Sequence, residues 1–541
     1  MAPDDVLIVG SGPTGAMAAA ELVTRGVHVT LVDYGDDDPA MRARVPDQPF
    51  SRFHREDPAQ RGYLLGDQLE GVPRTGVRVG AQLTPPRQFT NRAAEQLLPV
   101  RSEDFHPMQS LALGGLGAAW GTACFTYTAD ECTRTGLNPA ALAAQYANVV
   151  QEAGISGPEE EDADTRLWWS GVTGHQPPLD IDTNSSSLLA AYQKDPARWR
   201  QRGFALGRIP LAINSRPHGG REANPYFDTD FYGDVRRSAY RPRYTIERLQ
   251  KEPNFRYVPN CLALNFREDA QGVELTCRRG NEPVTFRGRR LILCAGAISS
   301  ARLALASLPL ADRVTTLLSS AYVYYPTLNL RMLGQSTADR RHSMAQLTAL
   351  YGDFAQPERT CSLQLYSYRS LLLFKLIKEM PLAPWAGRLM ARAMVDALAI
   401  FGVFFPDEAG PTKTMRLGAS TTSPVPDLHI AYARPSAEQT RQSELEAGLR
   451  GCFWRLGCVP LTRVDPGQAG SIHYGGTIPQ VNPVNPAFHT LADGRLGGSS
   501  RVFVGDTASW NWLPCKGPTF TAMAGARVVA KHVAASLGER T

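Results

Sequence analysis

A glycine-rich turn near the N-terminus restricts the fold of this chain more than any other feature. The apolar run at residues 6–9 leads into the motif GSGPTG at residues 10–15, and a run of helix-forming residues follows directly. A second apolar run at residues 27–32 ends in Asp33. This order of strand, glycine turn, helix, strand and acid is typical of a parallel βαβ unit that binds a dinucleotide. It predicts an α/β fold with a Rossmann-like domain at the start of the chain.

The residues of this turn have separate physical roles. Gly10 permits the tight turn, Gly12 lets the backbone approach a pyrophosphate, and Gly15 lets the helix pack closely on the strand. The N-terminus of the helix offers free N–H groups and the positive end of its dipole to the phosphates. Asp33 can accept hydrogen bonds from the ribose hydroxyls and disfavours a 2′-phosphate, which argues against NADP, although the motif does not distinguish FAD from NAD. The candidate cofactor-binding residues here are Gly10, Ser11, Gly12, Pro13, Thr14, Gly15 and Asp33.

Length and composition limit the class of protein. A chain of 541 residues exceeds what one hydrophobic core usually serves, so two closely joined domains are expected. The net charge is only +5 and the basic residues are scattered, which excludes the charge pattern of a nucleic-acid-binding protein. Nine cysteines without a CxxC pair disfavour both a disulfide framework and a metal site. The N-terminus enters a strand with no basic leader, so the expected location is the cytoplasm.

The segment 370–405 is rich in Leu, Phe, Met and Ala, but charged residues and two prolines interrupt it. No charge-free run approaches the ~20 residues that a membrane-spanning helix needs, so no membrane span is expected. The segment favours a buried or partly exposed pair of helices. The alternative is a lid or surface that contacts a membrane or an apolar substrate.

Three later segments add candidates for cofactor contact. The run LGGLGAAWGT at 113–122 suits backbone pressed against a flat ring system, although a tight glycine turn is the alternative. Residues 255–305 read as strands that return to a buried strand ending in AGA, then a helix, which fits an insertion in an FAD domain. The run RVFVGD at 501–506 precedes a loop and a C-terminal helix. The candidates in these segments are Gly115, Trp120, Gly121, Cys261, Leu262, Ala295 and Asp506.

Two C-terminal motifs, together with these segments, resemble the glucose-methanol-choline (GMC) oxidoreductases, and within them the pyranose-oxidase-like branch. The run IHYGGT at 472–477 is similar to the family's H-x-G-G-T element, and CKGPTFTAM at 515–523 is similar to its G-x-N-P-T-L-T-A-M element. The resemblance covers roughly half of the chain, in its FAD-binding parts. It implies an FAD-binding Rossmann-like domain joined to a sheet-and-helix substrate domain.

The resemblance also implies roles for individual residues. Family members oxidise alcohols by passing a hydride to flavin N5 while a base removes the hydroxyl proton, and His473 occupies the place of that base. Asp506 would hydrogen-bond the ribityl chain or order the pyrophosphate, with an ordinary cap on the following turn as the alternative. Pro518 and Thr519 would place backbone N–H groups near the flavin pyrimidine, where the N-terminus of the last helix stabilises negative charge.

The sequence departs from the family pattern at two positions. Gly517 stands where the family usually carries Asn or His, the partner that positions the substrate hydroxyl beside the first histidine. Lys516 is therefore a second catalytic candidate, and Asn511 in the preceding loop is another. The competing interpretation of Lys516 is a solvated charge on a loop. Ala119 stands where some pyranose-oxidase-like members carry the histidine that tethers FAD, so we expect FAD to be bound non-covalently.

The positions of the motifs predict a discontinuous domain arrangement. The FAD-binding domain is expected to gather residues 1–150, 241–315 and 465–541, and residues 151–240 and 316–464 are expected to form the substrate-binding domain. Candidate strands of the second domain are residues 322–332, 344–351 and 428–433.

The resemblance implies an FAD-dependent oxidoreductase that acts on a CH–OH group of a sugar-like or other hydroxylated small molecule. Lysine is scarce and arginine abundant, as in a GC-rich genome, and the substrate domain carries no family signature. These two features favour a tailoring step in specialised metabolism, such as antibiotic biosynthesis. The electron acceptor is either dioxygen or another molecule. Three alternatives stay open. One is oxidation of a bulky apolar alcohol, and another is redox-neutral flavin chemistry, which the glycine at 517 suggests. The third is a flavin-binding protein without catalysis, which the presence of His473 disfavours.

Overall fold

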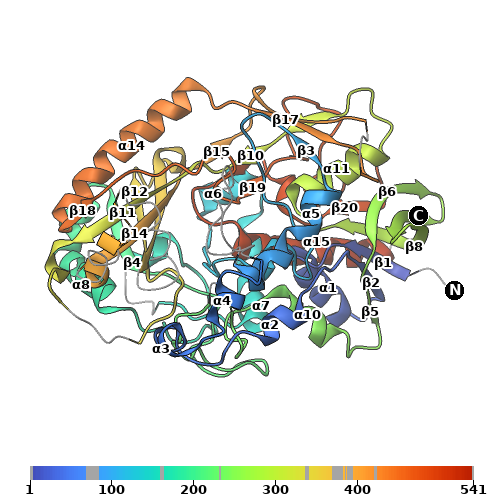
Figure 1. Ribbon diagram of the computed structural model, residues 1–541. Coiled ribbons are helices and arrows are strands. Elements are labelled where there is room, and N and C mark those ends of the chain that lie inside the picture. The colour runs from blue at the N-terminus through green and yellow to red at the C-terminus, as the bar shows by residue number, and fades with distance from the viewer. Residues whose placement is uncertain are drawn as a thin grey trace.

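Two large sheets lie toward opposite sides of the molecule, and both chain termini lie beside the sheet that contains β1 (Asp4–Val9) (Figure 1). The structure, a computed structural model, describes residues 4–68, 84–158, 164–230, 233–335, 340–367, 382–383, 385–386, 394–419 and 423–538. The helices used below are α1 (Pro13–Thr24), α6 (Ala129–Thr135), α7 (Pro139–Ala153), α8 (Thr183–Gln193), α10 (Pro242–Leu249), α11 (Ala297–Ser307), α14 (Ser436–Arg455) and α15 (Thr519–Gly538). Shorter helices are α2 (Pro39–Ala43), α3 (Phe50–Glu56), α4 (Gln60–Leu64), α5 (Arg92–Leu97) and α9 (Pro196–Arg200).

The first sheet is built from segments far apart in the sequence. Its order is β5-β2-β1-β8-β7-β6, and β20 pairs with β8 beside this path. Parallel pairing joins five strands of this sheet to one another: β1, β2, β5, β8 and β20. The first part of β8 also pairs with β7, and β7 with β6, in an antiparallel meander. Their bounds are β1 (Asp4–Val9), β2 (Val29–Val32), β5 (Phe255–Val258), β6 (Leu262–Asp269), β7 (Gly272–Arg279), β8 (Glu282–Leu293) and β20 (Val502–Val504).

The helix α1 is buried almost all round, because β1 lies on one side of it and α10 and α15 pack on others. Its small residues, rich in alanine, permit this close packing. Gly12 is the N-cap and Pro13 occupies the first turn, where its missing N–H costs nothing. The predicted order of strand, glycine turn, helix and strand is therefore observed at residues 4–32.

The second sheet is antiparallel, with the order β18-β11-β14-β13-β12-β4. One face, which includes Leu363, Leu365 and Phe401, packs against apolar residues of α8 and α14 such as Phe453. The opposite face carries Gln364, which is paired with Gly402 on β14. The bounds are β4 (Phe204–Arg208), β11 (Tyr322–Asn329), β12 (Leu347–Gly352), β13 (Thr360–Ser367), β14 (Leu398–Phe404) and β18 (Cys458–Pro460).

Small sheets join the two parts. A four-stranded sheet has the order β3-β17-β16-β9, and two strand pairs, β10 with β19 and β15 with β21, bring residues near 474 and 512 against the middle of the chain. Their bounds are β3 (Val100–Arg101), β9 (Val314–Thr316), β10 (Leu318–Ser319), β15 (Asp407–Glu408), β16 (Lys413–Leu417), β17 (Leu428–Tyr432), β19 (Tyr474–Gly475) and β21 (Trp512–Leu513).

The expected strands at 322–332, 344–351 and 428–433 correspond to β11, β12 and β17, although β17 lies in the four-stranded sheet. The helical interpretation of 370–405 was wrong for its last part, because residues 398–404 form the buried central strand β14. Most of the remaining segment lies outside the described residues. In the part of the chain that the structure describes, no helix is long and apolar enough to cross a membrane. The boundaries proposed for the two domains stay a prediction.

Candidate functional site

A long cavity connects the glycine turn after β1 with the second sheet. Most of the residues predicted from the sequence line it, namely Gly10, Ser11, Gly12, Pro13, Thr14, Asp33, Gly115, Trp120, Gly121, Cys261, Leu262, Ala295, His473, Asp506, Pro518 and Thr519. Gly15 and Lys516 are not among the described residues that line it. The cavity is continuous from the dinucleotide turn to His473, as an elongated cofactor with a nucleotide at one end and a reactive ring at the other requires.

The glycine turn is shaped by close backbone contacts. Gly10 has φ +99°, and a Cβ atom there would lie 2.6 Å from the carbonyl oxygen of Cys294. A Cβ atom on Gly15 would lie 1.9 Å from the carbonyl oxygen of Gly10, so Gly15 lets α1 approach the turn, as predicted. Gly12 has no side chain to cap α1, which leaves the first N–H groups of the helix for a ligand. These features suit a bound pyrophosphate.

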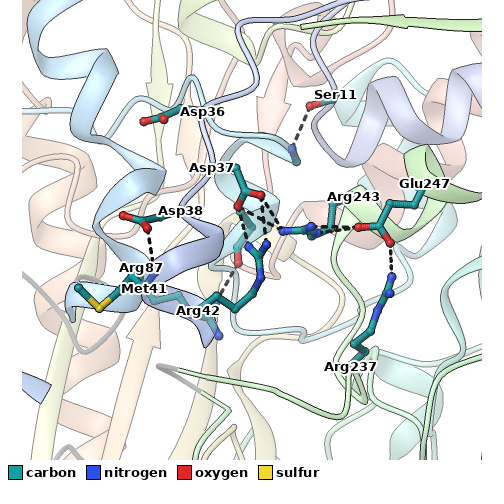
Figure 2. A network of polar contacts seen from close by, with 12 residues as sticks. Ser11, Asp36, Asp37, Asp38, Met41, Arg42, Arg87, Arg237, Arg243 and Glu247 are labelled. Carbon is teal, nitrogen blue, oxygen red and sulfur yellow. Dashed lines mark hydrogen bonds and ion pairs between the residues drawn. The ribbon is translucent and has the colours of Figure 1, made fainter. Parts of the chain in front are cut away.

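Asp33 is held at the end of β2 by two hydroxyl donors. The hydroxyls of Ser11 and Tyr257 both donate to Asp33 Oδ2, the latter at 3.2 Å. Burial raises the pKa of Asp33 to about 7, although these hydrogen bonds oppose the shift. Ser11 Oγ also accepts a hydrogen bond of 2.9 Å from the backbone N–H of Gly114, which ties the turn to the 113–122 segment (Figure 2).

The 113–122 segment is fixed from behind by two buried arginines. Arg87 Nη1 donates to the carbonyl oxygen of Ala118 at 2.8 Å, and Arg241 Nη1 donates to that of Trp120 at 2.7 Å. Trp120 Nε1 in turn donates to the carbonyl oxygen of Tyr240 at 3.0 Å. We call Arg87 and Arg241 the arginine clamp. The clamp leaves the opposite side of the segment, including Gly115 and Gly121, to line the cavity.

An ion-pair network connects the chain after Asp33 to α10 (Figure 2). Asp37 lies between Arg42, at 2.6 Å, and Arg243, at 3.2 Å, and Arg243 also pairs with Glu247. Partial burial opposes ionisation of Asp37, but the hydrogen bond from Arg42 and the charges of both arginines outweigh it and lower the pKa. Because α10 also packs on α1, the network fixes the outer edge of the nucleotide end.

His473 lies at the other end of the cavity, immediately before β19. Its ring stacks on Phe404 with centroids 5.0 Å apart, and burial lowers its pKa to about 4. Nδ1 is enclosed and has no hydrogen-bond partner among the described residues. The preceding residue, Ile472, has φ +59°, a left-handed conformation that is costly for a β-branched side chain. Such local strain persists where the surrounding structure enforces it, and it is often found at functional sites.

Residue 517, which lies beside His473, is a glycine and contributes no side-chain atoms to this part of the cavity. A Cβ atom on Gly517 would lie 3.8 Å from His473 Cε1, so the family's Asn or His would reach the imidazole from here. Lys516 does not replace it, because Lys516 Nζ forms a buried ion pair with Glu131 Oε2 at 2.7 Å. The alternative of a solvated loop charge is not observed either, since Lys516 is only 2% exposed. Asn511 accepts a hydrogen bond from the N–H of Val481 and is not among the described lining residues.

Asp506 and the start of α15 complete the middle of the cavity. The carboxylate of Asp506 accepts hydrogen bonds from Gly296 N–H at 2.9 Å, Ser300 Oγ at 2.6 Å and Ala508 N–H at 2.9 Å. Burial raises its pKa to about 6. Asp506 thus caps the following turn, as the alternative interpretation proposed, while it also lines the cavity. Thr519 begins α15, so the N-terminus of that helix lies at the cavity wall.

Three lining residues of the second sheet were not predicted from the sequence: Gln364 and Tyr366 on β13, and Phe404 on β14. The available signal was the alternation CSLQLYS at 361–367, in which Leu363 and Leu365 alternate with polar or amphipathic residues. Alternation shows that two faces differ, but it does not show that one of them meets a cavity. Among the described residues, no group of three or more His, Cys, Asp or Glu side chains is arranged to hold a metal ion.

Comparisons with known proteins identify FAD-binding and oxidase relatives. A family model described as FAD binding domain matches residues 4–49. Paromamine 6′-oxidase from Streptomyces fradiae is 27% identical over 316 residues, which cover 56% of this chain and 49% of that protein. 6‴-Hydroxyparomomycin C oxidase from Streptomyces lividus is 26% identical, covering 56% of this chain and 50% of that protein. The chain therefore matches about half the length of these curated relatives.

Solved structures are similar along nearly the whole chain. Pyridoxine 4-oxidase from Mesorbium loti has a TM-score of 0.58 at 14% identity, with 98% of each chain covered. A fungal aryl-alcohol oxidase has a TM-score of 0.58 at 12% identity, with 100% of each chain covered. The resemblance to the GMC oxidoreductases is confirmed at the level of the fold, and the prediction that the cofactor is FAD is confirmed by the match at residues 4–49.

Proposed function

We propose that the protein is an FAD-dependent oxidoreductase that oxidises a CH–OH group of a sugar-like or other hydroxylated metabolite, with His473 as the base. The observation that carries this proposal is the position of His473: a buried imidazole of lowered pKa lines the same cavity as the dinucleotide turn. The described residues fit FAD, since the cavity offers a glycine turn at one end, Asp33 for a ribose and a helix N-terminus beside Pro518 at the other.

The chain's own residues have defined tasks in this reaction. Bound FAD supplies a hydride acceptor. His473 is neutral at pH 7 because burial lowers its pKa, so it can accept the hydroxyl proton of a substrate. Since Nδ1 is enclosed, we assign Nε2 as the nitrogen that takes the proton. The ring of Phe404, stacked on the imidazole, fixes its orientation and excludes water from that side.

The first experiment mixes the oxidised protein anaerobically with a panel of alcohols: paromamine, methyl glucoside and benzyl alcohol. Bleaching of the flavin by at least one of them supports the proposal, and the preferred alcohol separates a sugar-like substrate from an apolar one. The relatives' names motivate paromamine, whereas Trp120, Tyr366 and Phe404 in the cavity wall motivate benzyl alcohol. Admission of air then tests dioxygen as the electron acceptor through formation of hydrogen peroxide.

The variant His473→Asn is expected to slow flavin reduction by about 100-fold or more, the usual range for removal of a general base. His532→Asn is the matched control, because His532 is exposed on α15 and its Nδ1 lies 3.0 Å from the carbonyl oxygen of Asp493, away from the cavity-lining residues. Equal rates of flavin reduction in the wild type and His473→Asn would contradict the assignment of the base.

Gly517 supports a second candidate, redox-neutral chemistry with the flavin as a scaffold or transient redox centre. The residue has no side chain to position a hydroxyl group beside His473. Formation of product without net bleaching of the flavin under anaerobic conditions would favour this candidate over alcohol oxidation.

A further inference from the structure

Gln364, Tyr366 and Phe404 line the cavity from one face of β13 and β14. On the same face of β13, the Ser362 hydroxyl donates to the carbonyl oxygen of Cys515 at 2.6 Å, two residues before Gly517. The register of these strands pairs Gln364 with Gly402 and Tyr366 with Ile400. Gly402 and Ile400 lie two and four residues before Phe404 on β14. Directly paired residues project from the same face of a sheet, and so do residues two apart. Phe404 stacks on His473, so this face leads from the imidazole to Gln364 and Tyr366, both of which line the cavity.

The amide of Gln364 is oriented by Tyr366. The hydroxyl of Tyr366 donates to Gln364 Oε1 at 2.6 Å, which directs the amide oxygen toward the tyrosine. Gln364 is only 5% exposed, and no described residue is hydrogen-bonded to its Nε2. Since Gln364 lines the cavity, both N–H groups of its amide are available to a ligand there. The Tyr366 hydroxyl is 3.7 Å from where a Cβ atom of Gly121 would lie, so the pair borders the 113–122 segment.

We propose that Gln364 is the substrate-positioning residue that replaces the side chain missing at Gly517, and that Tyr366 orients it. Gln364 Nε2–H donates to the substrate oxygen that gives its proton to His473. This is the contact that an Asn at position 517 would make, supplied instead by an amide on β13. The donated hydrogen bond strengthens as negative charge develops on the oxygen, which favours the transition state over the bound alcohol. The inference rests on the proposed alcohol oxidation.

The test compares Gln364→Leu, Gln364→Glu and Tyr366→Phe with the wild type, all loaded with FAD. The matched control is Thr348→Val: Thr348 is paired with Gln364 on β12 and is buried, but its hydroxyl bonds the carbonyl oxygen of Leu363 and it is not among the described lining residues. The anaerobic rate constant of flavin reduction is measured with whichever of paromamine, methyl glucoside and benzyl alcohol bleaches the wild type fastest. FAD content and unfolding temperature are measured for each variant.

At neutral pH we expect Gln364→Leu and Gln364→Glu to slow reduction by about tenfold or more, Tyr366→Phe by less, and Thr348→Val by under about twofold. The rate of Gln364→Glu should recover as the pH is lowered, because a protonated carboxyl group can donate the missing hydrogen bond, whereas Gln364→Leu should not recover. A purely structural role for Gln364 would not give this difference between the two pH profiles.

The outcomes separate this inference from the proposed function. If no alcohol bleaches the wild-type flavin, the proposed function and this inference both fail. If the wild type is bleached while Gln364→Leu and Gln364→Glu react at the wild-type rate, only the inference fails. If Gln364→Leu loses FAD or stability, the decision passes to Gln364→Glu, whose rate either recovers at low pH, in support, or stays independent of pH, which overturns the inference.

Discussion

Burial controls the protonation of His473. Transfer of an imidazolium from water into an apolar site is unfavourable, and no acidic group of the described residues lies near enough to His473 to offset this cost. The pKa of His473 therefore falls from its ordinary value of 6.5 to about 4. A base that stays neutral over the whole physiological range needs no carboxylate beside it. The strained backbone at Ile472 and the stacked ring of Phe404 hold the imidazole in this position.

This low pKa predicts the pH dependence of the reaction. The rate constant of flavin reduction divided by the dissociation constant of the alcohol should be constant from about pH 8 down to about pH 5, and fall only in more acid solution. It should do so because protonation removes the lone pair that accepts the hydroxyl proton. Stopped-flow measurements across this range, with retention of FAD checked at each pH, test the prediction. A fall centred near pH 6.5 would show an imidazole in contact with water.

The same shift predicts a change in stability. Between pH 6.5 and about 4 the unfolded chain binds a proton at His473 that the folded protein does not, so the free energy of unfolding decreases as the pH falls through this window. The contribution of one group is at most about 1.4 kcal/mol per pH unit. Urea unfolding at several pH values should give a smaller acid loss for His473→Asn than for the wild type. Parallel curves for the two proteins would contradict the prediction.

At the scale of elements, the arginine clamp determines the shape of the 113–122 segment. Arg87 and Arg241 are both buried, and burial lowers the pKa of both, with that of Arg87 reaching about 9. Their donated hydrogen bonds satisfy carbonyl groups that a glycine-rich segment cannot satisfy with a regular ladder. A segment held in this way can present backbone to a flat ring without the help of its own side chains.

Arg241→Met is therefore expected to weaken both stability and FAD binding. It leaves the carbonyl oxygen of Trp120 without this donor, which should cost about 1–3 kcal/mol of the free energy of unfolding. Arg416→Met is the control, because Arg416 forms an ion pair with Asp312 in which both side chains are more than half exposed. That variant should change stability by less than about 1 kcal/mol. Urea unfolding and fluorescence titration with FAD measure the two effects, and equal behaviour of both variants would contradict a role for the clamp.

The sequence predicted those parts of the site in which chemistry restricts the backbone locally. The turn at Gly10 and Gly15 has contacts that only glycine permits, and such positions leave a readable pattern. Gln364 left no comparable pattern, because its role depends on the pairing of β13 with β14 across a long stretch of chain. Lys516 shows the opposite limit: its position beside Gly517 made it a candidate, but its partner, Glu131, lies 385 residues away in sequence.

At the scale of the whole molecule, buried ion pairs join the C-terminal segment of the chain to α6 and to α1. Lys516 binds Glu131, and Arg527 on α15 binds Glu21 on α1. Glu131 also accepts a hydrogen bond of 2.8 Å from the N–H of Thr128, so the same carboxylate caps α6 and holds the segment before α15. Removal of one member of such a pair leaves the other charge buried alone, whereas removal of both charges does not.

Lys516→Met is accordingly expected to lower the free energy of unfolding by about 3–5 kcal/mol, and the double variant Lys516→Met/Glu131→Gln should recover part of this loss. Because the ammonium group points to Glu131, the double variant, once it holds FAD, should reduce its flavin at a rate close to that of the wild type. Urea unfolding measures the first effect and anaerobic stopped-flow the second. A double variant that is folded and holds FAD but is reduced at least about 100-fold more slowly would instead give Lys516 the catalytic role that its place in the sequence suggested.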